Sequence, residues 1–198
     1  MKTIQKIALL LLSSLIFMAC EDEDPIIIDP GTPDCVDTQS AFQSLFDSLI
    51  SDGYTDEVTM DTEVHEYTFS LSSDEEVCKI GYQSQHEVAS TPYLIEIFDQ
   101  STSSIIYSAS HAFEAGATSY VEPDEKIELK AGISYTLRRI QRDWNANIGN
   151  TIGRVAWKDT MNFPYTHGLL TITGSDSYGA GGPSPNRIVP YIDLIFKD

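Results

Sequence analysis

The stretch Glu-Tyr-Thr-Phe-Ser-Leu at residues 66–71 decides the fold class, because every second residue in it is apolar. Successive side chains of a β-strand point to opposite faces of a sheet, so this alternation is typical of a strand with one buried and one solvated face. The same period returns at Cys78, Ile80 and Tyr82. A denser apolar run at residues 93–98 predicts a central strand that is apolar on both faces. The sequence therefore indicates a sheet protein.

Further short apolar runs continue this pattern, with Gly, Pro, Asn and Asp between them. They predict strands at residues 105–107, 119–122, 126–130, 133–140, 151–157, 169–173 and 188–196. Pro190 lacks a backbone N–H, which places the last strand at a sheet edge or at a bulge. Roughly ten short strands with turns between them predict a mainly β fold, a single β-sandwich with a jelly roll as one variant. We assign this sandwich to residues 54–198.

Three segments of this region resemble the small β-sandwich modules that accompany bacterial surface proteins and glycan-active enzymes. They are Lys-Ile-Gly-Tyr at residues 79–82, the run at residues 93–99, and Leu-Lys-Ala-Gly-Ile-Ser-Tyr-Thr at residues 129–136. The last of these indicates a turn before a strand that packs its Tyr. These accessory modules have no agreed activity, so the resemblance implies a fold and assigns no functional residue.

A helical pattern precedes the strands. The apolar residues that fall on one side of a helix are Ala41, Phe42, Leu45, Phe46, Leu49 and Ile50. Asp37 or Thr38 can cap the start of this helix, and Gly53 can end it. We therefore predict one amphipathic helix over residues 37–53, whose apolar side covers the sandwich.

The N-terminal residues have the pattern of a secretory signal peptide. Lys2 and Lys6 precede an almost uncharged apolar run at residues 7–18, and Ala19 is the small residue that a signal peptidase requires. The run has about 12 residues, whereas a helix that spans a membrane needs roughly 20. We expect residues 1–19 to be removed and not to span a membrane.

Cys20 stands directly after this signal, and Phe17-Met18-Ala19-Cys20 resembles the bacterial lipobox, with Phe17 where the family has Leu. The resemblance implies that Cys20 carries lipid, and several acyl chains on one cysteine anchor a protein stably to a membrane. The alternative is that Cys20 is merely the first residue after an ordinary cleavage.

An acidic run, Glu-Asp-Glu-Asp at residues 21–24, follows Cys20 and is similar to the export signal of Bacteroidota surface lipoproteins. This resemblance implies a protein of the outer membrane that is displayed on the cell surface. The run also has the composition of a solvated spacer. Because Pro25, Pro30 and Pro33 follow it, residues 20–36 are predicted to form an extended stalk.

The chain is strongly acidic. It has 12 basic residues against 30 acidic ones, a net charge of −18, and removal of Lys2 and Lys6 with the signal leaves −20. Such a charge repels phosphate backbones, whose recognition needs clustered Lys and Arg. We expect no nucleic-acid partner.

Two cysteines remain once Cys20 is assigned to lipid. Cys35 and Cys78 can pair in the cell envelope, which permits disulfides, and closing this loop would contribute roughly 4 kcal/mol to stability. The alternative is two separate thiols, with Cys78 acting as a small apolar residue of a strand. The sequence leaves both arrangements open.

Motifs for catalysis are incomplete in this chain. His65-Glu66 begins the zinc-protease phrase H-E-x-x-H, but Phe69 stands at its last position. Residues 174–182 are rich in Gly and Ser, yet Asp176 occupies the place of the nucleophile in G-x-S-x-G, and we expect a loop between two strands. We predict no enzyme activity, no cofactor and no metal ion.

Basic residues and tryptophans gather in one region. Half of the basic residues that remain after signal cleavage lie within residues 138–158, together with both tryptophans. Aromatic planes beside amides and Arg suit a sugar, whose ring face stacks while its hydroxyls form hydrogen bonds. The predicted ligand site consists of Arg138, Arg142, Trp144, Asn145, Asn147, Trp157 and Tyr165. The alternative places Trp157 in the core and pairs the arginines with acids across the sheet.

Location and fold class favour a noncatalytic binding or adhesion module, for a glycan or for an envelope protein. A second interpretation is a structural or accessory subunit of an outer-membrane complex, docked through the predicted helix or a sheet edge. A third is a hydrolase with an unrecognised pair of carboxylates, the arrangement that glycosidases use.

Overall fold

The computed structural model describes residues 35, 39–83, 92–147 and 152–197, all within one compact unit, Pro33–Asp198. The predictions made for residues 1–34, which are the signal peptide, the lipid on Cys20 and most of the stalk, lie outside these residues. No helix in the described ranges is long and apolar enough to cross a membrane.

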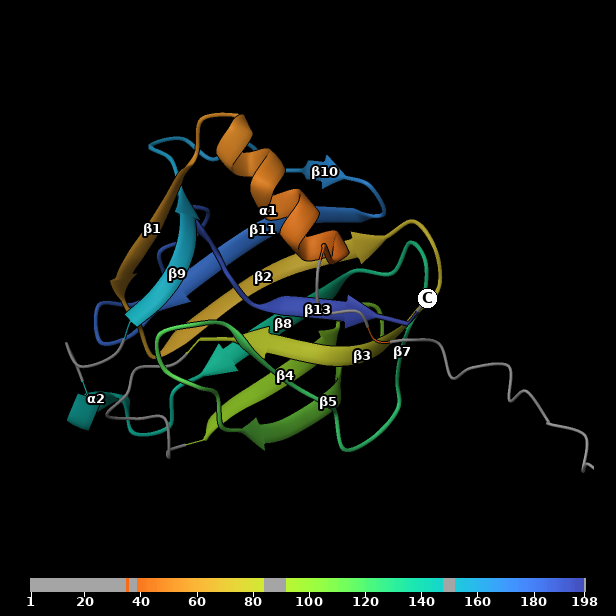
Figure 1. The fold of residues 1–198 in the computed structure, drawn as a ribbon, viewed down its shortest axis with the longest axis horizontal. Coiled ribbons are helices and arrows are strands. Elements are labelled where there is room, and N and C mark those ends of the chain that lie inside the picture. Colours follow the sequence, from red (N-terminus) through yellow and green to blue (C-terminus); the bar gives the residue numbers. More distant parts are fainter. Residues whose placement is uncertain (1–34, 36–38, 84–91, 148–151, 198) are drawn as a thin grey trace, which may run out of the picture. The chain divides into compact units, whose positions relative to one another are not determined.

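The strands form three antiparallel sheets (Figure 1). The largest has the order β10-β11-β2-β8-β4-β5, with bounds Tyr165–His167, Leu170–Tyr178, Val64–Leu71, Tyr135–Ile140, Tyr93–Asp99 and Ser104–His111. The second has the order β13-β3-β6, which are Asp193–Phe196, Glu75–Tyr82 and Ser119–Val121, and β7 (Ile127–Leu129) also pairs with β3. The third is β1-β9-β12, which are Thr55–Met60, Ile152–Trp157 and Ile188–Pro190. Side chains from all three sheets meet in one hydrophobic core, and the predicted β-sandwich is confirmed.

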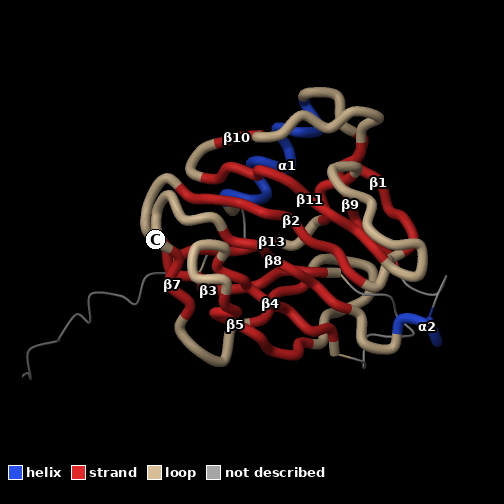
Figure 2. Tube along the Cα trace, turned by 180° about the vertical axis from the view of Figure 1, so that it is seen from behind, coloured by secondary structure: helices blue, strands red, loops and turns tan. Residues whose placement is uncertain are grey.

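Alternation along the strands builds this core. Tyr67, Phe69 and Leu71 of β2 are buried, and the residues between them are only partly buried. The prediction for residues 93–98 was wrong in one respect, because Ile95 and Ile97 of β4 are fully buried while the residues between and beside them are not. Only one face of this sheet packs against the core. Figure 2 shows the sheet from behind, with β10 at the top and β5 at the bottom.

The helix α1 (Ala41–Ser51) is shorter than predicted. It begins later because its cap is Ser40, whose Oγ accepts a hydrogen bond from the Gln43 backbone N at 2.9 Å. Gly53, with a φ of 86°, stands just after its end, as expected for a residue that tolerates this conformation. The buried side of α1 consists of Phe42, Leu45, Phe46 and Leu49, and the helix contacts β13, β10, β11 and β9.

A buried carboxylate joins α1 to the second sheet. Asp193 of β13 is fully buried. Ser40 Oγ donates to it at 2.7 Å, Gln43 Nε2 at 2.8 Å and Tyr120 Oη at 3.0 Å. These three donors offset the loss of hydration, although burial still raises the pKa of Asp193. The start of the helix is therefore fixed to the sandwich by polar contacts as well as by its apolar side.

One predicted strand is divided in two in the structure, and two observed strands were not predicted. The single strand expected at residues 188–196 is two strands, because the chain leaves β9 after Pro190 and pairs with β3 from Asp193 onward. Pro190 lies on the edge strand β12, in agreement with its missing N–H. Neither β1 nor β10 was predicted: residues 55–58 of β1 are all exposed and show no apolar period, and β10 is very short.

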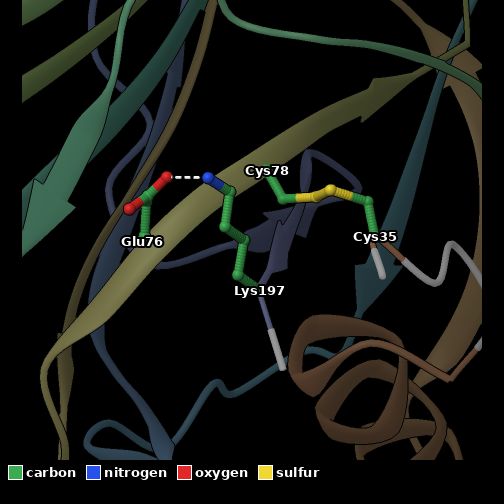
Figure 3. The surroundings of a disulfide bond; sticks show 4 residues. All are labelled: Cys35, Glu76, Cys78 and Lys197. Atoms are coloured by element: carbon green, nitrogen blue, oxygen red, sulfur yellow. Dashed lines mark hydrogen bonds and ion pairs between the residues drawn. A yellow bond between two sulfur atoms is a disulfide. The ribbon is translucent and has the colours of Figure 1, made fainter. Parts of the chain in front are cut away.

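Cys35 and Cys78 are joined by a disulfide, with Cα atoms 5.9 Å apart (Figure 3). Cys78 is buried on β3, so the bond fixes the chain ahead of α1 to the second sheet. Lys197 and Glu76 form an ion pair close to it (Figure 3). Of the two arrangements that the sequence allowed, the structure has the pair.

Candidate functional site

The two tryptophans of the predicted site have unexpected surroundings. Trp144 begins the short helix α2 (Trp144–Asn147) and is only 7% exposed, so it does not present the free aromatic plane that was expected. Trp157 ends β9 and is 39% exposed, so it is not the core residue that the alternative proposed. Trp144 lines a pocket to which Trp157 does not contribute.

Arg138 of the predicted site is engaged by acids. It lies on β8 in register with Glu66 of β2 and Glu96 of β4. Its Nε is 2.6 Å from Glu66 Oε2, and its Nη1 is 3.5 Å from Glu96 Oε2. This is the cross-strand pairing that the alternative predicted, and Arg138 balances charge within the sheet.

The remaining residues of the predicted ligand site do not lie together at one place on the surface. Tyr165 Oη donates to Asp52 Oδ2 at 2.7 Å and so ties β10 to the end of α1. Asn147 Nδ2 bonds the backbone of its own turn at 2.9 Å. The members that are simply exposed are Arg142 and Asn145. Of the seven predicted residues, Trp144 lines the pocket of about 340 Å³ described next, and the other six do not line it.

The pocket beside Trp144 has a volume of about 340 Å³. Its other walls are Thr62, Ser184 and the segment 177–182. These walls come from the turn before β2, from α2 after β8 and from the end of β11, which are neighbouring strands of the largest sheet. The pocket therefore lies at the end of this sheet that α2 marks in Figure 1.

A glycine brings the wall of the pocket against the tryptophan. A Cβ at Gly179 would stand 2.7 Å from two carbons of the Trp144 ring, so a larger residue would displace the ring. At Gly181, by contrast, a Cβ would meet no atom within 4 Å. Gly179 thus lets the pocket wall pack directly against the Trp144 ring, whereas Gly181 faces open space.

Asp176 fixes both ends of this wall. Its Oδ1 accepts hydrogen bonds from the backbone N of Ser177 and of Ser184, each at 2.8 Å. The prediction of a loop at residues 174–182 was wrong for the first part, because β11 continues to Tyr178. Strand and turn together hold the pocket wall in one conformation.

A buried polar network holds Trp144 in place. Its Nε1 donates to the backbone O of Asp61 at 3.2 Å. The carboxylate of Asp61 accepts from Tyr82 Oη at 2.9 Å and is paired with Arg139. Arg139 Nη1 also donates to the backbone O of Thr62 at 3.0 Å. The network thus positions two walls of the pocket, the tryptophan and the turn before β2.

The charged pair of the network is sealed from solvent. Asp61 and Arg139 have no exposed surface, and the guanidinium lies 5.2 Å from the ring centres of Tyr82 and Tyr93. Burial raises the pKa of Asp61 to about 6, although Arg139 opposes this shift. Burial, with the charge of Arg139, lowers the pKa of His65, whose Nδ1 is 3.4 Å from Asp61 Oδ1. Through the bonds to Trp144 Nε1 and to the backbone of Thr62, these buried residues hold two walls of the pocket.

Sequence reasoning missed Asp61 and Arg139. A signal for Arg139 is present, because it follows Arg138 in a strand and neighbours in a strand point to opposite faces. One of the two arginines therefore faces the core, where it needs an acidic partner. Nothing in the sequence singles out Asp61 among 30 acidic residues as that partner.

A second pocket, of about 420 Å³, lies beside the disulfide. Its lining includes Cys35, Glu76 and Glu122. Lys126 and Lys197 also line it, and both form ion pairs with Glu76. Within the described part of the chain, no group of three or more His, Cys, Asp and Glu residues is placed to hold a metal ion.

No protein-family model matches this chain, and no curated protein matches it either. The class of the protein is therefore defined by its fold, a mainly antiparallel β-sandwich domain with one helix packed on it. Its function has to be inferred from its pockets and surfaces.

Proposed function

We propose that this protein is a lipid-anchored module of the cell surface that binds a small neutral sugar unit of a glycan in the pocket beside Trp144, without reacting with it. The observation that carries the proposal is the lining of the pocket. It offers hydroxyl groups, glycine backbone and aromatic side chains, and the described lining residues include no Asp, Glu, His, Lys, Arg or Cys.

The hydroxyls of the pocket suit the hydroxyls of a sugar. Sugar hydroxyls need partners that both donate and accept hydrogen bonds, and Ser, Thr and Tyr do so. Such groups are supplied by Thr62, Ser177, Tyr178 and Ser184. The volume of about 340 Å³ lies in the range of small-molecule pockets. Trp144 adds an apolar wall for the C–H groups of a sugar ring.

The charge of the chain argues for a neutral ligand. A net charge of −18 repels anionic glycans. A cationic ligand would gain affinity from a carboxylate in the pocket, and none of the described lining residues supplies one. A neutral, hydroxyl-rich group is the ligand that these two facts favour.

The surroundings of the pocket favour binding over hydrolysis. A glycosidase needs two carboxylates that flank the scissile bond. Asp61 directly precedes the lining residue Thr62, but its carboxylate is fully buried and engaged by Arg139. Asp176 directly precedes Ser177, but its carboxylate holds the backbone of the pocket wall. Neither acid is arranged to protonate or attack a ligand.

The predicted tether is consistent with display of this pocket. Cys35, where the N-terminal segment is bonded to the sandwich, shares a pocket with Lys197 near the C-terminus. In Figure 1 the C-terminus lies at the right and α2 at the left. The pocket beside Trp144 therefore lies at the other end of the described domain from Cys35, the residue that follows the predicted tether.

A glycan array tests this proposal, with the chain from residue 20 onward carrying Cys20→Ser so that it needs no detergent. We expect binding to one group of neutral glycans that share a sugar unit, and no gain in binding from sialic acid or sulfate. An array without any bound glycan, or with binding confined to anionic glycans, would contradict the proposal.

A further inference from the structure

The strand β5 forms an edge of the largest sheet, where β4 is its partner among the described strands. An edge strand leaves backbone N–H and C=O groups unpaired, and proteins protect such an edge with charges, with Pro or with short strands. Other edges of this fold carry that protection. β1 contains Asp56 and Glu57, β12 contains Pro190, and β6, β10 and β13 have only three or four residues each.

β5 lacks this protection. It has eight residues, and the segment 100–113 around it contains no Asp, Glu, Lys or Arg in a chain of which 21% is charged. Its Ile105 is 52% exposed. The serines that are also exposed are Ser104, Ser108 and Ser110. Tyr107 and His111 are buried and hydrogen-bonded to each other at 2.5 Å. The strand is thus anchored on its inner face, and its outer edge has no partner among the described strands.

We propose that β5 is an interface between two copies of this chain, which pair their β5 strands antiparallel about a twofold axis. A twofold interface uses the same segment from each copy, so it requires a segment that fits itself. A strand of Ser, Ala, Ile and Tyr with one buried His, and without Asp, Glu, Lys or Arg, meets this requirement. The register shift between Ile97 and Phe98 interrupts the start of β5 and leaves residues 107–111 as the regular part. Pairing there joins the two largest sheets into one.

The absence of charged side chains on β5 favours a second copy over a basic partner as the occupant of this edge. Each copy carries −18, so two copies repel one another except where their surfaces are uncharged. A basic partner would be drawn to acidic surfaces and would gain nothing from a neutral strand. The repulsion also makes the pairing depend on salt, because added ions screen it and strengthen the dimer.

Light scattering of the full chain in detergent, combined with absorbance and refractive index to separate the protein mass from the detergent mass, tests this proposal. Ser108→Lys and Ser110→Lys place charges on exposed positions of the regular part of β5, and Val58→Lys is the matched control because Val58 is 56% exposed on β1. We expect a dimer for the wild type and for Val58→Lys, and a monomer for both β5 variants. The dimer fraction of the wild type should rise with added NaCl.

A wild-type chain that is monomeric at every protein and salt concentration would overturn the proposal. A dimer that survives both β5 substitutions, or that Val58→Lys also abolishes, would overturn it as well. A monomer that captures an uncharged extended peptide along β5 would assign the edge to a peptide instead. Circular dichroism checks the folding of each variant, and the result for either β5 variant counts only when that variant is folded.

Discussion

Arg139 and Asp61 form an ion pair in which both side chains are completely buried. Arg139 belongs to β8 of the largest sheet, and Asp61 directly follows β1 of the third sheet. Tyr82, which donates to the same carboxylate, comes from β3 of the second sheet. One charged pair therefore links all three sheets. The hydrogen bond from Trp144 to the backbone of Asp61 extends this link to the pocket.

Removal of the buried arginine should destabilise the fold strongly. Arg139→Met is expected to lower the free energy of unfolding by about 3–5 kcal/mol, because it leaves the Asp61 carboxylate buried without a counter-charge. The neighbouring Arg138 is 33% exposed, and Arg138→Met should cost about 0–1 kcal/mol. Urea denaturation measures both changes. Equal losses for the two variants would show that the buried pair has no special role.

His65 should make the stability depend on pH. Because its pKa in the fold is lowered, the unfolded state binds more protons than the folded state below pH 6.5. The stability that neutral His65 contributes is therefore fully present above pH 6.5 and is lost as the pH falls toward the lowered folded pKa. The raised pKa of Asp61 acts in the opposite direction, since the folded state then holds the extra proton.

His65→Gln removes the pH dependence that comes from His65 and keeps the one that comes from Asp61. Compared with the wild type, its free energy of unfolding should therefore decline less between about pH 7 and about pH 5. Denaturation curves recorded across this window give the comparison. If the free energy of unfolding depended on pH in the same way for the wild type and for His65→Gln, His65 would not take up a proton on unfolding.

The two glycines of the pocket should respond differently to a methyl group. Gly179→Ala places a Cβ 2.7 Å from the Trp144 ring and should cost roughly 1–3 kcal/mol, with a change in tryptophan fluorescence. Gly181→Ala, in the same segment, meets no atom within 4 Å and should stay within about 0.5 kcal/mol. Thermal unfolding separates the two. If Gly179→Ala were as mild as its neighbour, the contact with Trp144 would not hold the pocket wall.

Lipid on Cys20 should decide where the protein partitions. Cys20→Ser removes the thiol that accepts the lipid, so the variant is expected to leave the detergent phase in a phase-separation assay. Cys35→Ser is the control, because it removes a cysteine of the disulfide and should not change the partitioning. Recovery of Cys20→Ser in the detergent phase would refute the anchor.

Much of the fold follows from local patterns that the sequence displays. Burial of one sheet face imposes a period of two, which is why β2 and β3 could be predicted from residues such as Phe69 and Ile80. The exposed residues of β1 have no such constraint and give no pattern. The change of sheet after Pro190 depends on which partner strand is available, and no local pattern records it.

The candidate site was harder to predict than the fold. The sequence drew attention to Trp144, but its burial depends on Gly179 and on the backbone of Asp61, both far away in the chain. Trp157 looked equally suited to stack on a ligand, yet the structure places it outside the pocket. Contacts between residues far apart in the chain decide which tryptophan lines the pocket. Residue type and local spacing do not record such contacts.

The most direct test of the proposed function compares two variants on the same neutral-glycan array as the wild type. Gly181→Phe places a ring in the wall of the pocket at a position where the backbone has room for it, and Trp157→Ala removes the exposed tryptophan outside the pocket. If the glycan binds in the pocket beside Trp144, we expect Gly181→Phe to abolish glycan binding and Trp157→Ala to preserve it. Binding that persists in Gly181→Phe and disappears in Trp157→Ala would contradict the proposed site.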